Sequence, residues 1–426
     1  MRDANRLFAL SEHIRCQAYL LATYYLELDA ESDVLGKASA FAVGQTIGTW
    51  IEVPGVTEAM RRHHEGRVVK VLEAPPVDLR TQAEGAVHGF FIQLALPVAN
   101  FGPHFPMLLT TLLGNDASTS VQAKLVDLEL PDDYAAALGG PRYGIAGVRD
   151  LVGVHDRPLL LNMIKPCTGL TPEAGARIFY ETALGGVDLI KDDELLGDPE
   201  FSPITERVRA YGEAARAAFE ETGKDVVYAV NITDSPDRVV DNARRAVEAG
   251  ARAVMVTYAT VGYGVLRAVS DAVDVPVLGH FAGSGTFFEG PRSGMSAPLA
   301  AGMLPRLAGA DFTVVTTPYG GYPMRRLQYL RTAHQLVLPR PHIAPTMPVI
   351  GGGVHPGVVP LYLRELGPDI VLGAGGSVQG HPGGAAAGVR AMRQAIDAAV
   401  ASRDLDQAAA EHPELASALE LWGRRD

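Results

Sequence analysis

Charged side chains are crowded directly after one apolar run of this sequence. Lys191, Asp192, Asp193 and Glu194 follow the run Val187–Ile190. Carboxylate oxygens are hard ligands that suit Mg²⁺, and three neighbouring negative charges repel one another unless a cation offsets them. The ammonium of Lys191 would repel a metal, so this lysine either pairs with the acids or is converted by CO2 to an anionic carbamate. The alternative is a solvent-exposed charge run held by salt bridges.

Other apolar runs also end in residues that could move protons. Lys165 stands just before Pro166, and His280 ends a run of its own. A partly desolvated lysine near a metal has a lowered pKa, and histidine titrates near neutral pH, so both are acid/base candidates. Each could instead be structural, as a salt-bridged lysine or a core histidine. We expect Cys167 to form pocket wall, because no neighbour in sequence argues for a lowered thiol pKa.

Glycines gather after two further runs, at Gly351–Gly353 and at Gly373–Gly376. Without a Cβ atom, the backbone can approach a ligand closely and aim several N–H groups at one anion. Because both segments carry such glycines, they predict a phosphate site built from Gly352, Gly353, Gly375 and Gly376. The alternative is a pair of tight turns with no ligand.

The apolar runs themselves predict the fold of the larger part of the chain. Eight of them follow one another beyond residue 150, separated by amphipathic stretches such as Pro172–Leu184, Ile204–Glu221 and Pro236–Ala249. Eight strand–helix units in about 250 residues favour an α/β fold, the (β/α)8 TIM barrel, in which the chemistry lies at the carboxyl ends of the strands. The predicted strands are Pro158–Ile164, Val187–Lys191, Asp225–Ile232, Ala253–Tyr258, Val275–His280, Asp311–Thr317, Met347–Gly351 and Asp369–Leu372.

The first part of the chain is less regular. Strand-like runs at Ala38–Val43, Phe90–Leu96 and Leu125–Leu128 alternate with helical stretches, which indicates an α+β domain. The turn-rich passage Gly139–Asp150 marks the boundary. We therefore expect an N-terminal α+β domain over residues 1–140 and a barrel catalytic domain over residues 141–426.

Bulk properties exclude some classes of partner. A net charge of −12 gives no electrostatic support for binding nucleic acid or an anionic membrane. Only Cys16 and Cys167 are present, so a disulfide framework is not expected and a cytoplasmic location is the default. We find neither a signal peptide nor an uninterrupted apolar stretch long enough for a transmembrane helix.

These motifs together resemble the ribulose-bisphosphate carboxylase (RuBisCO) superfamily over nearly the whole chain. The segment IKP is followed about twenty residues later by GGVDLIKDDE. The resemblance extends to GQTIGTW (44–50) and LLGN (112–115) in the first domain, to GPRYGIAGVRD (140–150) at the entry to the barrel, and to GGGVHPG (351–357) and GAGGSVQGHPGG (373–384) near its end. It implies a ferredoxin-like N-terminal domain before the barrel.

The resemblance implies roles for the barrel residues. Lys191 would be a carbamylated lysine that binds one Mg²⁺ together with Asp193 and Glu194. Lys165 would handle protons on an enediolate. His280 would be a further acid/base group or would contact a substrate hydroxyl, and the four glycines would hold a phosphate.

It also implies an assembly. The family's obligate unit is a homodimer whose active sites lie at the subunit interface. Thr49, Trp50 and Asn115 would reach the active site from the N-terminal domain of the partner subunit.

Departures from the family pattern argue against CO2 fixation. Carboxylation in this family needs a lysine on the loop after the sixth barrel strand, but that loop reads TTPYGGYPMRR and no lysine follows Lys224. Cys167, Phe281, Val314 and Gly44 stand where the family has a lysine, an arginine, a histidine and an acid. The chain therefore resembles the non-carboxylating RuBisCO-like proteins (form IV), with one phosphate site where RuBisCO has two. Phe281, Val314 and the aromatics Tyr319 and Tyr322 suggest a less polar distal pocket.

The resemblance implies a phosphorylated keto-sugar or sugar acid as substrate and a metal-stabilised enediolate. The sequence favours a decarboxylase or transcarboxylase acting on 3-oxo-isoapionate 4-phosphate, in apiose catabolism. A β-keto acid that loses CO2 requires little proton abstraction, so the loss of RuBisCO's extra cations is tolerable.

Three alternatives stay open. One is isomerisation of 5-methylthioribulose 1-phosphate, which could use Lys165 and His280. Another is the methionine-salvage enolase acting on 2,3-diketo-5-methylthiopentyl 1-phosphate. Relatives with that activity take a base lysine from the N-terminal domain, where Lys37, Lys70 and Lys124 occur here without a site-like motif. The last is a non-catalytic sugar-phosphate-binding protein, which would need no proton-handling lysine beside a metal.

Overall fold

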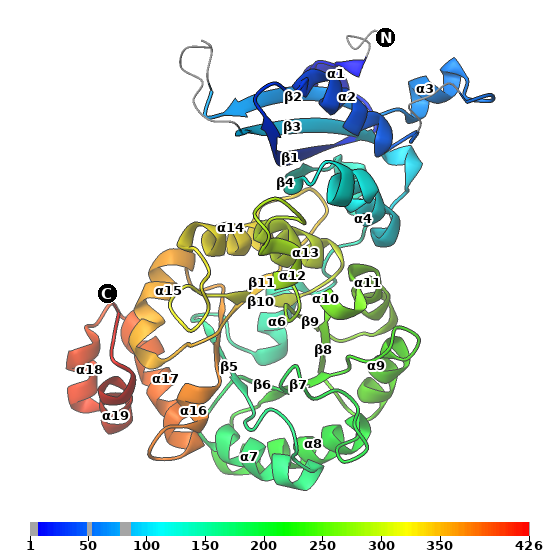
Figure 1. Ribbon diagram of the computed structural model, residues 1–426. Coiled ribbons are helices and arrows are strands. Elements are labelled where there is room, and N and C mark those ends of the chain that lie inside the picture. The colour runs from blue at the N-terminus through cyan, green and yellow to red at the C-terminus, as the bar shows by residue number, and fades with distance from the viewer. Residues whose placement is uncertain (1–6, 49–52, 77–86, 426) are drawn as a thin grey trace. The chain divides into compact units, whose positions relative to one another are not determined.

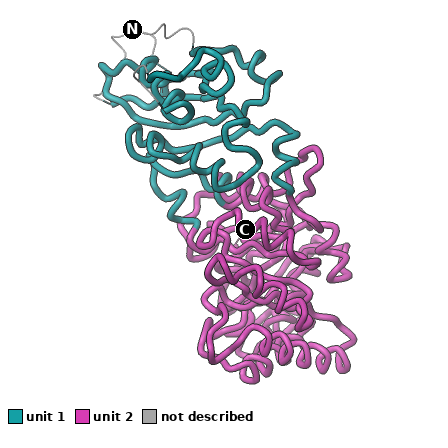
Figure 2. The backbone as a smooth tube through the Cα atoms, turned by 90° about the vertical axis from the view of Figure 1, so that its right-hand side faces the viewer, with its two compact units in different colours: residues 1–139, 284–300 teal, residues 140–283, 301–426 magenta. Residues whose placement is uncertain are grey.

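The computed structural model describes residues 7–48, 53–76 and 87–425. The chain divides into two compact units, one of residues 1–139 with 284–300 and one of residues 140–283 with 301–426 (Figure 2).

The first unit is built on a four-stranded antiparallel sheet with the strand order β2-β3-β1-β4. Its strands are β1 (Tyr19–Asp29), β2 (Arg67–Ala74), β3 (Val87–Pro97) and β4 (Lys124–Glu129). Its helices are α1 (Ser11–Arg15), α2 (Val34–Gly44), α3 (Glu58–His64), α4 (Phe105–Leu113) and α5 (Asp132–Ala137). The order of the strands, with α2 between β1 and β2 and α4 between β3 and β4, confirms the ferredoxin-like α+β fold.

One predicted strand of this unit is wrong. The run Ala38–Val43 lies within helix α2. A short apolar run does not by itself distinguish a strand from a buried helix. Here Asp33 caps the helix, because its side chain accepts a hydrogen bond from the N–H of Gly36, and three alanines in six residues favour the helical state.

Residues 284–300 belong to the first unit although they follow the fifth strand of the barrel in sequence. The N–H of Leu125 in β4 donates to the carbonyl of Gly294, and the N–H of Ser296 donates to the carbonyl of Leu125. The Nζ atom of Lys124 donates to the carbonyls of Phe288 and Gly290, at 2.7 and 2.6 Å. The amine of Lys124 is therefore engaged in holding this segment on the sheet.

The second unit is a closed barrel of eight parallel strands, as predicted (Figure 1). The strands are β5 (Leu159–Met163), β6 (Leu189–Lys191), β7 (Val227–Asn231), β8 (Ala253–Thr257), β9 (Val277–His280), β10 (Phe312–Thr316), β11 (Met347–Gly351) and β12 (Val371–Ala374). Every strand falls on one of the eight apolar runs. They are buried on both faces, which explains why they read as continuous apolar segments rather than as alternating ones.

Helices surround the ring of strands (Figure 1). They are α7 (Pro172–Leu184), α8 (Ile204–Thr222), α9 (Val239–Glu248), α10 (Tyr258–Val261), α11 (Tyr263–Ala272), α13 (Leu304–Leu307), α14 (Arg326–Val337), α15 (Val359–Leu366), α16 (Gly376–Gln379), α17 (Ala385–Val400), α18 (Leu405–Glu411) and α19 (Pro413–Trp422). The helix α6 (Gly144–Val152) precedes β5, and its Val148 side chain belongs to the barrel core. The short α12 (Gly285–Phe288) follows β9 in sequence. The prediction for Pro172–Leu184 matches α7, and α8 and α9 agree with their predictions at nearly all positions.

The interior of the barrel is packed with apolar side chains, so it is a core and not a pore. They include Leu161, Leu189, Met255, Phe312 and Val349, all almost fully buried. Because this core is filled, a ligand can enter only at an end of the barrel, where the strands finish.

Candidate active site

A cavity of about 410 Å³ lies at the carboxyl ends of the barrel strands. Most of the predicted barrel site residues line it, namely Lys165, Asp193, Glu194, His280, Gly352, Gly353, Gly375 and Gly376. The cavity therefore brings together residues from the ends of β5, β6, β9, β11 and β12. These residues are up to 211 positions apart in sequence, from Lys165 to Gly376. Parallel strands of a closed barrel end on one rim, which is why a list of strand ends becomes a site.

The predictions for the N-terminal domain concern residues of the other unit. Thr49 and Trp50 lie outside the described residues. Asn115 precedes the single turn Asp116–Ser120 in the first unit. A Cβ atom on Gly44, which replaces the family's acidic residue, would overlap the carboxylate of Asp116, so an acid from a neighbouring element fills that space.

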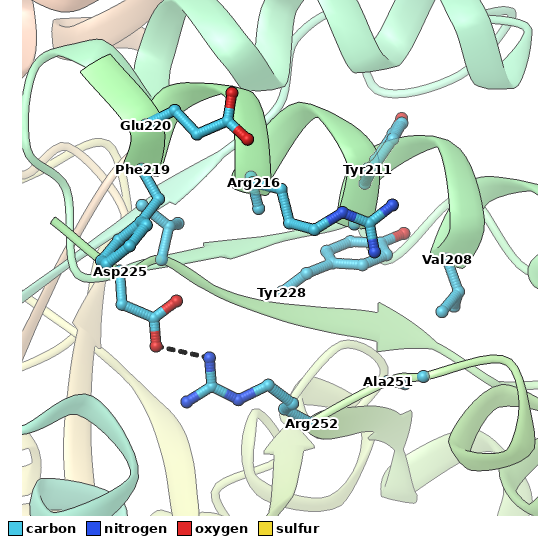
Figure 3. A pocket seen from close by; sticks show the side chains of 13 residues that line it. Val208, Tyr211, Arg216, Phe219, Glu220, Asp225, Tyr228, Ala251 and Arg252 are labelled. Carbon is cyan, nitrogen blue, oxygen red and sulfur yellow. Dashed lines mark hydrogen bonds and ion pairs between the residues drawn. The ribbon is translucent and has the colours of Figure 1, made fainter. Parts of the chain in front are cut away.

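A larger hollow of about 680 Å³ lies elsewhere on the barrel (Figure 3). It is lined by α8 side chains such as Tyr211 and Phe219, by Tyr228, and by the ion pair of Asp225 with Arg252 (Figure 3). Asp225 and Arg252 precede their strands, so this hollow opens near the amino ends of β7 and β8. It contains none of the predicted site residues, and the chemistry therefore belongs to the smaller cavity.

Lys165 and the acids form a tight cluster. The Nζ atom of Lys165 lies 2.6 Å from Oδ2 of Asp193 and 3.0 Å from Sγ of Cys167. Burial lowers the pKa of the Lys165 amine, but its hydrogen bonds to Asp193 and Cys167 outweigh burial, so the pKa lies above its ordinary value. The Asp193 carboxylate stabilises the ammonium directly, whereas the lowered pKa that we expected depends on a neighbouring metal cation.

Lys191 lies beneath the cavity floor and is 1% exposed. Its Nζ atom donates to the carbonyl of Asp192 at 2.8 Å and lies 3.7 Å from Oε2 of Glu194. Burial lowers the pKa of this amine in spite of the acids around it. The neutral amine is the form that can take up CO2, so the burial of Lys191 suits the predicted carbamate.

Lys191 could complete a donor set for Mg²⁺ that Asp193 and Glu194 begin. Among the described residues, no three His, Cys, Asp or Glu side chains gather closely enough to hold a metal ion. Asp193 and Glu194 supply two carboxylates, and a carbamate on Lys191 would supply the third oxygen ligand. Oxygen ligands of this kind are those that Mg²⁺ prefers.

His280 is positioned as a hydrogen-bond donor rather than as a free base. Its Nδ1 atom accepts from the N–H of Ala282 at 3.2 Å, and its Nε2 atom lies 3.4 Å from Oε2 of Glu194. Burial holds the pKa of His280 well below its usual range. A neutral ring that accepts at Nδ1 carries its proton on Nε2, a tautomer assigned from these contacts.

Asp192 is separated from its neighbours, which the sequence did not reveal. Its Oδ1 accepts from the hydroxyl of Tyr228 at 2.6 Å, and its Oδ2 accepts from Arg207 at 3.2 Å and from the N–H of Asn231 at 2.9 Å. Asp192 therefore points into the barrel wall, and only Asp193 and Glu194 face the cavity. The sequence contains one sign of this partner. Arg207 is a charged residue on the otherwise apolar, buried face of α8, between Ile204 and Tyr211.

Arg207 connects this anchor to the loop that carries the acids. The side chain is fully buried, and it donates to the carbonyl of Gly197 at 2.8 Å and to the carbonyl of Ser202. On the other side, the amide of Asn231 donates to the carbonyl of Glu194 at 3.2 Å. The loop after β6 is thus held from behind at several points while its two carboxylates face the cavity.

The glycine turns after β11 and β12 form another part of the cavity. Gly352 and Gly353 have φ values of 95° and 86°, in the left-handed region that only glycine adopts readily. A Cβ atom on Gly376, at the start of α16, would meet nothing within 4 Å, so the backbone there faces open space. These turns suit the predicted phosphate, because the ligand could approach the main chain closely.

Another part of the cavity wall is aromatic and apolar. Phe281 stacks on His280 with ring centroids 5.3 Å apart, and Tyr322 meets Phe281 edge-on at 6.1 Å. Val314 lines the same space. Tyr319, which we expected here, is not among the lining residues, because its hydroxyl is bound to Glu365 at 2.6 Å.

Comparison with known proteins identifies the family. The model of the ribulose bisphosphate carboxylase large chain, catalytic domain, matches residues 144–325 and 337–422. The chain belongs to the RuBisCO large-chain family. A ribulose bisphosphate carboxylase-like protein of Archaeoglobus fulgidus is 43% identical over 97% of this chain and 95% of its own length.

Two other relatives in the RuBisCO family carry a more specific description. A 2,3-diketo-5-methylthiopentyl-1-phosphate enolase of Geobacillus kaustophilus is 39% identical over 95% of this chain and 98% of its own length. The crystal structure of a rubisco-like protein (MtnW) from Alicyclobacillus acidocaldarius superimposes with a TM-score of 0.87, at 37% identity, over 96% of this chain and 100% of its own. The chain is therefore of the non-carboxylating RuBisCO-like type (form IV). Within the described part, no helix has the length and hydropathy needed to cross a membrane.

We predict that Arg207→Met lowers the free energy of unfolding by about 3–5 kcal/mol, because it leaves the buried carboxylate of Asp192 without its charged partner. Chemical denaturation monitored by circular dichroism measures this change. Arg216→Met is the matched control on the exposed face of the same helix, and we expect it to change stability by less than about 0.5 kcal/mol. Equal effects of the two substitutions would contradict the proposed anchor.

Proposed function

We propose that this RuBisCO-like chain catalyses the Mg²⁺-dependent enolisation of a phosphorylated diketone with an apolar tail. The reference substrate is 2,3-diketo-5-methylthiopentyl 1-phosphate. The observation that carries the proposal is the cavity itself, in which a glycine backbone suited to one phosphate and an uncharged aromatic wall flank Lys165, Asp193 and Glu194. The enolase description of relatives that align over nearly the whole chain supports the same reading.

This proposal replaces the reaction that the sequence favoured. None of the comparisons described above supports a decarboxylase or transcarboxylase acting on 3-oxo-isoapionate 4-phosphate. The methionine-salvage enolase, which was an alternative, has the support of the relatives' descriptions. An apolar wall also suits a methylthio tail better than it suits the polar groups of a sugar acid.

The residues divide the work by position. Lys165 would move the proton on carbon, because its amine borders the cavity beside Asp193. The proton on Nε2 of His280 would hydrogen-bond to a substrate oxygen on which negative charge develops. Mg²⁺, held by Asp193, Glu194 and carbamylated Lys191, would supply positive charge beside the substrate's carbonyl oxygens.

The choice of Lys165 as the proton-handling lysine follows from the state of the other lysines. Among the described residues of the first unit, Lys124 is engaged with Phe288 and Gly290, while Lys37 lies in helix α2 and Lys70 in strand β2. An enolase that takes its base from the N-terminal domain therefore has no obvious candidate lysine here. This observation favours, as a second candidate, the isomerisation of 5-methylthioribulose 1-phosphate, which has the same phosphate and tail.

We propose the assembly as well as the reaction. The chain would act as a homodimer in which Thr49, Trp50 and Asn115 of one subunit complete the site of the other. Light scattering on purified protein measures the mass directly. A monomer that retains full activity would contradict shared active sites.

One experiment separates the reactions. The purified protein, with Mg²⁺ and bicarbonate, is incubated in D2O with each methylthio substrate and followed by NMR. An enolase removes a proton from carbon of the diketone, so the enol forms and deuterium enters the diketone when the step reverses, whereas an isomerase interconverts the ketose and aldose phosphates. Release of CO2 from 3-oxo-isoapionate 4-phosphate with neither reaction would revive the decarboxylase. Tight binding without turnover of any of the three would instead indicate a binding protein.

We predict that Lys191→Met abolishes Mg²⁺-dependent turnover, by about a thousandfold or more, because the third metal ligand is lost. Steady-state kinetics over a range of Mg²⁺ concentrations measures the loss. Lys224→Met removes an exposed lysine and should leave the rate unchanged. Near-normal turnover by Lys191→Met would exclude the carbamate assignment.

We predict that Cys167→Ser keeps activity within roughly tenfold, which corresponds to about 1.4 kcal/mol of barrier. A serine hydroxyl can also accept the hydrogen bond that Lys165 donates to Sγ. The ratio kcat/KM under saturating Mg²⁺ measures the effect. A fall of several orders of magnitude would make Cys167 part of the chemistry.

A further inference from the structure

The loop between β10 and α14 is fastened at both ends to one side chain. The carboxylate of Glu365 in α15, itself 4% exposed, accepts from the hydroxyl of Tyr319 at 2.6 Å and from Nε of Arg326 at 2.7 Å. Tyr319 begins the loop and Arg326 begins the next helix. Tyr362 adds a hydrogen bond from its hydroxyl to Thr317 at 2.8 Å. The loop is therefore held by contacts within the protein.

The middle of this loop rests directly on the glycine turn after β11. A Cβ atom on Gly320 would overlap the carbonyl oxygen of Gly352, and it would lie 2.9 Å from Cα of Gly353. A Cβ atom on Gly353 would in turn lie 2.5 Å from Cα of Gly320. Two main chains are thus in contact, and no side chain can move aside to make room. The neighbouring Gly321 differs, because a Cβ atom there would meet nothing within 4 Å.

This backbone contact determines where Tyr322 lies. Its ring covers the Cα of Gly352 so closely that a Cβ atom there would fall against the ring carbons. The same ring meets Phe281 edge-on and lines the cavity. Tyr322 therefore joins the glycine turn to the aromatic wall, and its place is fixed by its neighbours in sequence.

We propose that Tyr322 is a specificity-determining residue, fixed by the Glu365 clamp and the Gly320 contact, that selects substrates with an uncharged, apolar end opposite the phosphate. At this end the described lining residues Phe281, Val314 and Tyr322 carry no charge. A second phosphate placed against them would lose hydration without gaining a partner, whereas a methylthio group would gain apolar contact. The inference rests on the proposed function for the phosphate site and adds the origin of selectivity.

The test compares two ligands that differ only at carbon 5. Binding of 5-methylthioribulose 1-phosphate and of ribulose 1,5-bisphosphate is measured by calorimetry, with Mg²⁺ and bicarbonate present. We expect the native protein to prefer the methylthio ligand by about a hundredfold, or about 2.7 kcal/mol. Gly320→Ala should reduce this preference at least tenfold, because the loop can no longer rest on Gly352. Gly321→Ala, one residue further on, should keep the native preference.

The side chain and the clamp are tested separately. Tyr322→Ala should reduce the preference as much as Gly320→Ala does. Glu365→Leu should reduce the preference because both ends of the loop are released. Glu365→Gln retains an oxygen acceptor for Tyr319 and Arg326, so it should keep the native preference. Thermal unfolding of each variant shows that the fold is kept.

Each outcome decides the inference. The inference would be overturned if Gly320→Ala and Tyr322→Ala kept the native preference. It would also be overturned if Gly321→Ala lost the preference equally, or if the native protein bound neither ligand. Failure of the proposed reaction can be distinguished from failure of this inference. If the protein binds with this selectivity but turns over neither methylthio substrate, the specificity role of Tyr322 stands and the enolase and isomerase assignments are wrong.

Discussion

The burial of one amine and two carboxylates at the end of β6 is the constraint on which the rest of the site depends. Lys191, Asp192 and Asp193 are each at most 3% exposed, in consecutive positions of the chain. Charges withdrawn from water are costly unless each is paired or neutralised. Asp192 is paired with Arg207 and Tyr228 behind the cavity, and Asp193 with Lys165 within it. Lys191 has the remaining position, where burial favours a neutral amine over an ammonium.

The barrel makes this arrangement possible because its strands end on one rim. A chain segment of three residues, β6, delivers the amine and the acids, while β5, β9, β11 and β12 deliver a second amine, an imidazole and two glycine turns. The packed core of the barrel closes the cavity from below. What distinguishes this member of the RuBisCO family is the other side of the cavity, where aromatic rings and a loop clamped by Glu365 stand in place of cations.

Much of this could be predicted from the sequence, for identifiable reasons. All eight barrel strands are buried on both faces, so each was visible as an apolar run, and their ends indicated which residues would meet. The strand prediction for Ala38–Val43 was wrong because a run of six mostly apolar residues does not distinguish helix from strand, and the decisive cap at Asp33 lies outside the run. The prediction that Tyr319 lines the cavity was wrong because its hydrogen-bond partner, Glu365, is 46 residues away in sequence, in helix α15.

The charges were harder to predict than the elements. The sequence grouped Asp192 with its neighbours, but side chains alternate in direction along an extended segment, so Asp192 points away from the cavity. The pKa of Lys165 was expected to fall beside a metal, and the hydrogen bonds of its amine to Asp193 and Cys167 raise it. Both observations concern pairings across the fold, which depend on distances that strand ends alone do not give.

The central claim is that Lys191 completes a cation site as a carbamate, and ¹³C NMR of the protein with ¹³C-labelled bicarbonate and Mg²⁺ tests it most directly. The account predicts one carbamate carbon per subunit that becomes more persistent as Mg²⁺ is added, and chemical trapping that locates it on Lys191. No carbamate at saturating Mg²⁺, or a carbamate located on another lysine, would contradict the account.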